Sequence, residues 1–403
     1  MFKEIRLDFQ IRAAIGTFLL SAVIIEASLF GSGRILQIGP LTLKMILFFF
    51  ALLYSVWSFF VGVRLSSRVL LLIVSYTFLL GLGSLIGLLA GAEADMIGGD
   101  IRQLSYLLIL PFFEMSISNE RRVWFAVRMI KIAAVIMTIF YLAIAGLMLS
   151  GILSFGAISG WLFAVGNGDF MFDATVGRVF YKGALYAGIA VILFFFDKGS
   201  WAKVGMVGTF ITLVLTVTRG FILALFLVAI LYLFMKRGKP ARRLAGIAVL
   251  LMAGMVSLPA LFTLAGDKTE SNSTRVVTAE QMLNRVDTLH TIFGHGIGIG
   301  VPVRPEHMEM SYMEIFYKQG FLGLFWWGTL ALLMLLDLRK SIHNGHENLA
   351  FALFLSAVFV ALESLTNPFI NNPIGMAAIL ISFVGLSVLA KTPSILSSEI
   401  VSI

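Results

Sequence analysis

The chain of 403 residues contains no cysteine. Disulfide bonds and cysteine-based metal or redox sites are therefore excluded, although a chain without thiols suits either side of a membrane. Charged residues are also scarce, at 13% of the chain, and there are only 5 histidines. Hydrophobic residues make up 59% of the chain, and the mean hydropathy is +0.97. A soluble domain could not bury so much apolar surface, so the composition predicts an integral membrane protein.

The hydrophobic residues form long runs without the short alternating pattern of a transmembrane barrel. Because lipid cannot hydrogen-bond a bare backbone, these runs predict a helical bundle. Each crossing needs about 20 apolar residues. The sequence thus predicts an all-α integral membrane protein with about 12 transmembrane helices in a single polytopic domain, 1–403. The helices are expected near residues 11–30, 42–63, 68–90, 101–118, 122–149, 182–196, 203–218, 219–236, 243–265, 321–337, 347–364 and 375–390.

The lysines and arginines of the connections predict the orientation of this bundle. If the N-terminus is cytoplasmic, well over half of the 30 basic residues fall in the inner connections. The outer side then receives the two long connections, about 150–181 and 266–320, and both termini are cytoplasmic. The net charge of +8 reflects this asymmetry, so we do not interpret it as nucleic-acid binding.

The second long connection holds most of the polar residues of the chain. It contains Gly294–Gly300, with glycine at every second position, which favours backbone close to a ligand or to another helix. This is not a dinucleotide-binding fingerprint, because the third glycine of GxGxxG is missing and no strand–helix unit surrounds it. Pro305 predicts the first turn of a helix that continues toward Gly320.

In that helix, four polar residues form one stripe: His307, Ser311, Glu314 and Lys318. The positive end of the helix dipole would keep the ring of His307 neutral and able to accept a proton, and the same end attracts phosphate oxygens. A histidine that only caps or packs is the alternative. The spacing of His290, His295 and His307 matches no common metal site, so no metal is predicted.

Two other features stand out from plain lipid-facing helix. Arg219 interrupts an apolar run from Val204 to Met235, at a turn expected on the outer side. Its guanidinium either snorkels toward water or holds an anionic group with its bidentate fork. The connection 150–181 carries polar and aromatic residues that suit carbohydrate as well as an ordinary solvated loop: Trp161, Asn167, Asp169, Asp173 and Arg178.

The order of these features resembles the O-antigen polymerase and O-antigen ligase superfamily. The resemblance consists of Thr218-Arg219-Gly220 between two helices, a long outer loop with a glycine-rich end, and then His307 with Tyr312-x-Glu314-x-x-Tyr317-Lys318-Gln319-Gly320-Phe321-Leu322-Gly323-Leu324. It covers about 110 residues, whereas the first 180 match only in hydropathy. Ligases of this family commonly have His-Asn where this chain has His307-Met308. Polymerases can carry an arginine and a glycine spaced as Arg285 and Gly296 are.

The resemblance implies a multi-pass protein of the bacterial inner (cytoplasmic) membrane with its active site facing the periplasm. The donor would be an oligosaccharide on undecaprenyl diphosphate, and the acceptor a hydroxyl of another glycan. No cofactor or metal would be needed, and a chain-length regulator protein is an expected partner. The product would be O-antigen or a related surface polysaccharide, made by inverting polymerisation.

Each expected role follows from the chemistry of such a transfer. Fixed cations would stabilise the leaving diphosphate: Arg219, Arg285, Arg304 and Arg178. A proton acceptor would activate the attacking hydroxyl, with His307 as the first choice and Glu309 or Glu314 as reserves. Sugar contacts are expected from Trp161, Asp169 and Tyr312. The alternatives are an O-antigen ligase that transfers the glycan to the lipid A core, or a transporter of lipid-linked sugars that merely binds the diphosphate.

Overall fold

The computed structural model describes residues 2–31, 36–39, 41–166, 170–173, 178–236, 238–264 and 269–393. The chain is 78% helical and has almost no sheet, which confirms the all-α expectation. Among the described residues, 5 helices are long and apolar enough to cross a membrane: Gln10–Leu29, Leu43–Phe60, Ser67–Leu89, Glu120–Leu149 and Ser311–His343. These helices indicate a helical membrane protein, while the count of twelve spans stays a prediction.

Most of the expected helices are present with bounds close to those predicted. The first half of the chain holds α1 (Phe2–Leu29), α2 (Leu43–Phe60), α3 (Ser67–Leu89), α4 (Ala94–Leu104), α5 (Leu110–Ser116), α6 (Glu120–Leu149), α7 (Phe155–Gly166) and α8 (Leu185–Phe195). The second half holds α9 (Ser200–Leu215), α10 (Arg219–Met235), α11 (Pro240–Leu264), α12 (Thr269–Leu283), α13 (Thr288–Phe293), α14 (Ser311–His343), α15 (Glu347–Glu363) and α16 (Pro373–Leu389).

Short polar residues fix the beginnings of several helices. The side chains of Thr42, Ser66 and Asn119 each accept a hydrogen bond from a backbone N–H in the first turn of α2, α3 and α6. Asn372 does the same for α16, where Pro373 occupies the first turn. Such caps satisfy N–H groups that have no partner inside the helix. They explain why apolar runs separated by only a few polar residues resolve into distinct helices.

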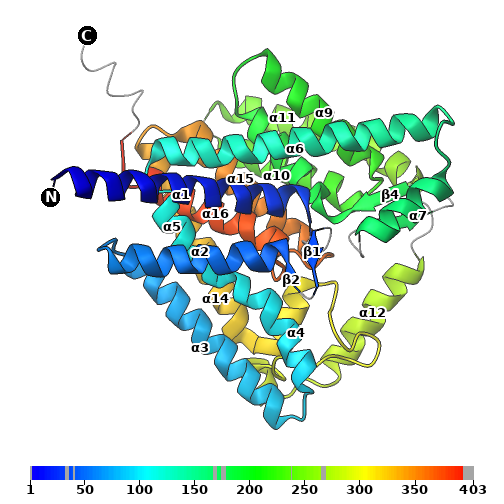
Figure 1. Ribbon diagram of the computed structural model, residues 1–403. Helices are drawn as coiled ribbons and strands as arrows, with labels where there is room; N and C mark the ends of the chain where they lie inside the picture. The colour runs from blue at the N-terminus through cyan, green and yellow to red at the C-terminus, as the bar shows by residue number, and fades with distance from the viewer. Residues whose placement is uncertain are drawn as a thin grey trace.

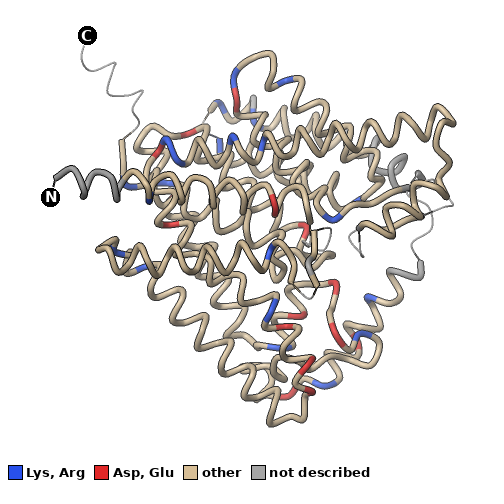
Figure 2. Tube along the Cα trace, in the orientation of Figure 1, with Lys and Arg blue, Asp and Glu red and all other residues tan. Residues whose placement is uncertain are grey.

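The helices lie side by side in a bundle with α16 at its centre (Figure 1). The side chains of α16 are buried along nearly its whole length, which is what a helix with apolar residues on every side requires. α15 packs against α16, and its buried face includes Phe359 and Val360. Long stretches of the bundle carry no charge, and many charged residues gather around α4, α12 and the start of α14 (Figure 2).

The helix expected near 101–118 is broken, which corrects that prediction. α4 ends at Leu104, a 3-10 segment η1 (Ser105–Ile109) follows, and α5 begins at Leu110. Pro111 lies in the first turn of α5, where its missing N–H is tolerated and where it prevents a continuous helix. α4 is a short amphipathic helix that places Asp100 on its buried face.

The helix expected to start at Pro305 begins at Ser311, so His307 lies outside it. The reason is a tight turn in which Val301 and Arg304 exchange backbone hydrogen bonds of 3.1 and 2.8 Å. Met308 is buried in a small apolar cluster with Val301, Met282 and Tyr317, which fixes the irregular segment before the helix. The dipole argument for His307 therefore does not hold.

Both long connections contain secondary structure. The first holds α7 and an antiparallel hairpin of β3 (Phe170–Asp173) and β4 (Arg178–Tyr181), followed by the 3-10 turn η2 (Lys182–Ala184). The second holds α12 and α13. A further short hairpin, β1 (Gln37–Ile38) with β2 (Leu41–Thr42), joins α1 to α2.

Contacts between helix ends define the two ends of the bundle. At one end the start of α3 meets the end of α14 through Arg68 and Asp337, and the start of α6 meets the start of α15 through Glu120 and His346. At the other end the backbone of Gly83, late in α3, meets the second long connection. We call the latter the site end, because it carries the polar residues described next.

Candidate functional site

The glycine-rich segment Gly294–Gly300 passes between three helices at the site end. Gly294, Gly296 and Gly298 have φ values of +77°, +100° and +86°, which favour glycine. A Cβ on Gly296 would lie 2.2 Å from the backbone N of Gly87 in α3. A Cβ on Gly298 would lie 2.6 Å from Ile97 in α4. The alternating glycines thus permit close packing against helices, which was one of the two expectations for them.

This segment also donates hydrogen bonds to carbonyl groups at a kink in α14. Gly320 has φ +64° and ψ −160° inside the helix, so the carbonyls just before it lack regular helical partners. The N–H of His295 donates to Tyr317 O at 2.7 Å, and the N–H of Gly296 donates to Lys318 O at 3.2 Å. The backbone of the segment therefore supplies donors at the kink, and the ring of His295 stacks on that of Tyr317 with ring centroids 4.3 Å apart.

Asp100 connects the segment to α4. Its Oδ2 accepts a hydrogen bond of 2.8 Å from the N–H of Gly298, and its two oxygens lie 2.7 and 2.8 Å from the ammonium of Lys318. Burial would raise the pKa of Asp100, but its hydrogen bond with His307 and the charge of Lys318 outweigh burial and lower that pKa. Asp100 is therefore a buried carboxylate held in its charged form.

Lys318 lies one turn after Glu314 on α14, and its ammonium is 2.8 Å from Glu314 Oε1. The other oxygen of Glu314 accepts from the amide of Asn371, which follows α15. Asn371 also accepts from the hydroxyl of Ser311 at 2.9 Å. Asp100, Glu314 and Lys318 form the buried charge cluster, with side chains only 5%, 7% and 3% exposed. Buried charges persist only when paired and hydrogen-bonded, as these are.

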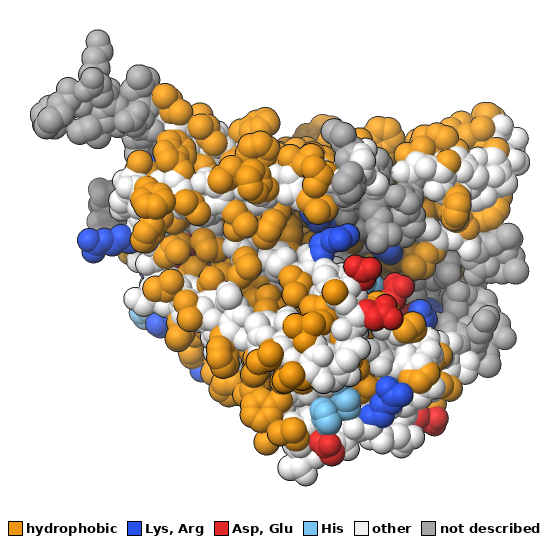
Figure 3. Space-filling model, turned by 60° about the horizontal axis from the view of Figure 1, so that its bottom comes forward, with side chains coloured by type: hydrophobic (Ala, Val, Ile, Leu, Met, Phe, Trp, Pro, Cys, Tyr) orange, Lys and Arg blue, Asp and Glu red, His pale blue; other side chains and the backbone are white. Residues whose placement is uncertain are grey.

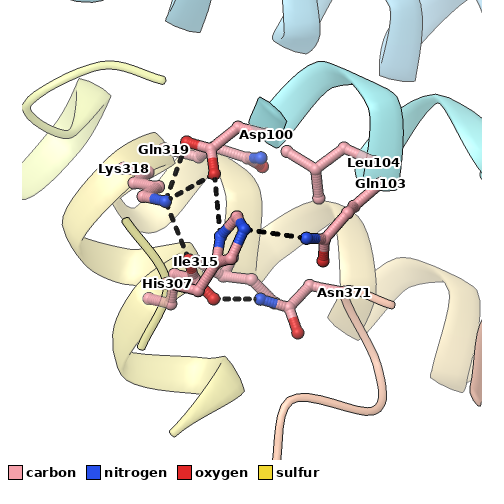
Figure 4. Close-up of a pocket in the computed structure, with 9 residues that line it drawn as sticks. Asp100, Gln103, Leu104, His307, Ile315, Lys318, Gln319 and Asn371 are labelled. Carbon is pink, nitrogen blue, oxygen red and sulfur yellow. Dashed lines mark hydrogen bonds and ion pairs between the residues drawn. The ribbon is translucent and has the colours of Figure 1, made fainter. Parts of the chain in front are cut away.

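His307 lies over this cluster with 43% of its side chain exposed. Its Nδ1 is 3.4 Å from Asp100 Oδ1, and its Nε2 is 3.0 Å from the side-chain nitrogen of Gln103 on α4 (Figure 4). Together with the cluster and Asn371, these residues line a small pocket that opens to solvent. In the space-filling view, histidine, basic and acidic side chains gather in one region of a face that is otherwise largely hydrophobic (Figure 3).

Three groups of this pocket could present ligand atoms to a metal ion. One atom each of Asp100, His307 and Glu314 lies within 4.8 Å of the others. The ammonium of Lys318 lies between the two carboxylates, however, and neutralises part of their charge as a cation would. The donor set therefore fits a lysine better than an ion. The expectation that the chain needs no metal stays a prediction.

A second ionic group lies in the same connection. Glu309 Oε2 is 2.9 Å from Nε of Arg275 on α12, and Glu309 Oε1 is 2.7 Å from Nη2 of Arg304. Arg275 also reaches Thr366 O at 3.5 Å, after α15. Both oxygens of Glu309 are thus engaged by guanidinium groups, in charge-assisted hydrogen bonds.

Arg219 begins α10 after a strained turn. The preceding Val217 has φ +49°, an unusual conformation for a β-branched residue. A Cβ on Gly220 would lie 3.0 Å from Oε2 of the buried Glu363, so any larger residue there would press on that carboxylate. Glu363 accepts from the amide of Asn367 at 3.1 Å. Asn367 O in turn accepts from Ser311 Oγ at 3.0 Å, which links the start of α10 to the pocket through the connection after α15.

The structure brings together only some of the predicted site residues. Among the described residues, His307 and Glu314 line the pocket, and none of the predicted arginines does. Arg285 is exposed, and its backbone oxygen contacts His295 Nε2 at 3.0 Å. The Tyr312 hydroxyl donates to Ala361 O at 2.8 Å, so it is engaged in helix packing.

The remaining predicted residues belong to the first long connection. Trp161 is exposed on α7. Asp169 and the side chain of Arg178 lie outside the described residues.

Sequence reasoning missed Asp100, Gln103 and Asn371, and assigned Lys318 only to a stripe. One signal was present for Asp100. Its spacing from Ile97 and Leu104 places it on the apolar face of a short helix, and all three are buried. A carboxylate in that position requires a cation, which comes from a helix more than 200 residues later in the chain.

The comparisons with known proteins add no family. No model of a known protein family matches this chain, and no curated protein sequence matches it. The functional argument therefore depends on the residues themselves.

Proposed function

We propose that the protein is a membrane glycosyltransferase that polymerises oligosaccharide units linked to undecaprenyl diphosphate at the periplasmic face of the bacterial inner membrane. The observation that carries the proposal is the pocket around His307. It places a half-exposed imidazole beside a buried carboxylate, at the end of the bundle that also carries Arg275, Arg285 and Arg304.

In the proposed reaction, an acceptor hydroxyl attacks the anomeric carbon of the donor sugar. The proton of that hydroxyl passes to His307, and the carbon–oxygen bond to the diphosphate breaks with its electron pair on the diphosphate. A single displacement of this kind inverts the anomeric carbon. The geometry favours His307 over the reserve bases, since Glu309 and Glu314 are both held in ion pairs with cations, whereas Nε2 of His307 faces only the neutral amide of Gln103, which an acceptor hydroxyl can replace.

The negative charge on the leaving diphosphate is best stabilised by cations that are already in position before the reaction. Arg304 and Arg275 hold a carboxylate between them, and a phosphate oxygen has the charge and geometry to take its place. Arg219, at the N-terminus of α10, would contribute a further guanidinium, with Arg285 and Arg178 from the two long connections. We assign these residues to the donor as part of the proposal.

Purified protein in lipid vesicles tests the proposal directly. With lipid-linked oligosaccharide as the sole substrate, we expect longer lipid-linked products. His307→Gln should lower the rate by about 10²-fold or more, the usual scale of general base catalysis. His343→Gln alters an exposed histidine at the opposite end of α14 and should leave the rate unchanged. Equal rates for the His307 variant and the unaltered protein would refute the role of His307 as the general base.

Ligase activity is the second candidate, because it uses the same donor and differs only in the acceptor. A strain lacking the protein separates the two. Surface glycan reduced to a single repeat indicates polymerase, whereas full-length glycan that stays on its lipid carrier indicates ligase. Movement of the lipid between leaflets without any new product would indicate a transporter instead.

A further inference from the structure

The two nitrogens of His307 contact groups of opposite hydrogen-bonding character. Nδ1 lies 3.4 Å from Asp100 Oδ1, and a carboxylate oxygen held in its charged form can only accept. Nε2 lies 3.0 Å from the side-chain nitrogen of Gln103, which can only donate. Both contacts therefore select the same tautomer, with the proton on Nδ1 and an accepting lone pair on Nε2.

Asp100 is itself fixed by two other groups. Gly298 donates a backbone N–H, and Lys318 contacts both carboxylate oxygens, while the side chain is only 5% exposed. A carboxylate held in this way cannot rotate to follow the ring. The ring must instead adopt the orientation that the carboxylate imposes, as happens where an outer group orients a histidine.

We propose that Asp100 is a positioning residue for His307. It keeps the proton of the neutral ring on Nδ1, directs Nε2 into the pocket, and stabilises the imidazolium that forms when Nε2 takes the proton of the acceptor hydroxyl. Gln103 marks the direction from which that hydroxyl approaches, because its amide occupies the place of a donor to Nε2 (Figure 4). The catalytic part of this inference rests on the proposed function, whereas the tautomer does not.

The tautomer can be measured without any assay of activity. Nitrogen-15 NMR of the protein in lipid, labelled in its histidine rings, distinguishes a protonated Nδ1 from a protonated Nε2. The signals of His307 are identified by their loss in His307→Gln. We expect Nδ1–H at pH 8 in the unaltered protein, and a shift of the population toward Nε2–H in Asp100→Asn. Finding Nε2–H in the unaltered protein would overturn the proposal.

Gln103→Leu keeps the test decisive even where Asp100→Asn does not fold. This variant removes the group facing Nε2 and leaves Asp100 and its partners in place. If Asp100 fixes the proton, His307 keeps Nδ1–H. A change of tautomer in Gln103→Leu would assign the positioning to Gln103 and refute the role of Asp100.

The pH profile of the transfer reaction tests the catalytic part. Asp100→Asn should lower kcat by about 10²-fold and leave the KM for the donor little changed, since Asp100 acts through His307. The acid limb of the kcat/KM profile should move to lower pH, because the neutral amide that replaces the carboxylate does not stabilise the imidazolium of His307. The other titratable groups of the pocket, Glu314 and Lys318, stay in place. A loss of rate with an unmoved acid limb would indicate a structural role only.

Two matched variants control for the loss of a carboxylate. Asp95→Asn removes an exposed charge from the same helix. Asp337→Asn removes a buried carboxylate, paired with Arg68, from the opposite end of the bundle. Neither should change the tautomer or the acid limb, although Asp337→Asn should lower stability.

The two levels of the argument fail in different ways. If the vesicles yield no transfer product but the ring shows Nδ1–H dependent on Asp100, the proposed function fails and the positioning of His307 stands. If product forms and the tautomer does not depend on Asp100, the positioning role fails alone.

Discussion

Lys318 is the only cation within 3 Å of both carboxylates of the buried charge cluster among the described residues, so its removal should have a large and specific effect. Lys318→Met keeps much of the side-chain length and leaves Asp100 and Glu314 buried without their ammonium. Removing one partner of a buried ion pair destabilises proteins by about 3–5 kcal/mol. We expect a loss of this size at pH 8.

The dependence of stability on pH should also change. In the unaltered protein the pKa of Asp100 is lowered, so its contribution to stability is present above the ordinary value of about 3.9 and disappears as pH falls through the lowered pKa. Without Lys318, uncompensated burial should raise that pKa. The variant should then gain stability as pH falls from 8 to 5, by up to about 1.4 kcal/mol for each pH unit.

Thermal unfolding in lipid nanodiscs at pH 5, 6.5 and 8, followed by tryptophan fluorescence, measures both effects. Lys340→Met is the matched control, because it removes an exposed lysine from the same helix. The reasoning is wrong if Lys318→Met lies within 1 kcal/mol of this control at pH 8, on the scale of a surface pair. It is also wrong if the variant gains no stability between pH 8 and pH 5, a range in which the contribution of Asp100 to the unaltered protein stays constant.

Three further predictions concern the connection before α14. Gly296→Ala should lower the free energy of unfolding by more than about 3 kcal/mol in the same assay, since the added Cβ would overlap the backbone of Gly87. Gly91→Ala is the control, because Gly91 has a φ of +83° but open space around it, and it should lower the free energy of unfolding by only about 1–2 kcal/mol. Burial and, to a lesser extent, the imidazole of His290 in α13 lower the pKa of His295. Protonation of His295 should therefore destabilise α13 as pH drops through about 6.5. The measurement is the rate of backbone amide exchange in α13, which should rise after correction for the intrinsic effect of pH on exchange. Glu309→Gln should keep most transfer activity, and a loss as large as that of His307→Gln would make Glu309 the base.

The helices could be predicted because each depends on its own residues. The apolar run before Met235 ends near the basic residues that follow it, and the helix expected near 375–390 corresponds to α16, Pro373–Leu389. The break between α4 and α5 was missed because the run around Pro111 is apolar throughout, and Pro111 at the first turn of a helix does not by itself reveal a break.

The site could be predicted only in part, for a different reason. His307 and Glu314 stand out because polar residues are rare in this chain. Their relation to Asp100 depends on the glycine-rich segment, which brings α4 beside α14 by backbone contacts that no side-chain pattern announces. The helix expected at Pro305 illustrates the same limit, since the turn at Val301 and the burial of Met308 are tertiary effects.

The charges of the pocket explain why a lysine and two carboxylates would surround a proton acceptor. Asp100 and Glu314 carry two negative charges and Lys318 one positive charge, so the buried charge cluster keeps one net negative charge beside His307. When the ring accepts a proton, the pocket as a whole becomes neutral, and the new charge is stabilised by groups already in place. A second cation in place of Glu314 would remove this advantage. The composition of the cluster therefore supports proton transfer to His307 more directly than it supports binding of an anion at the same point, and under the proposed function the diphosphate would lie with the arginines outside the pocket.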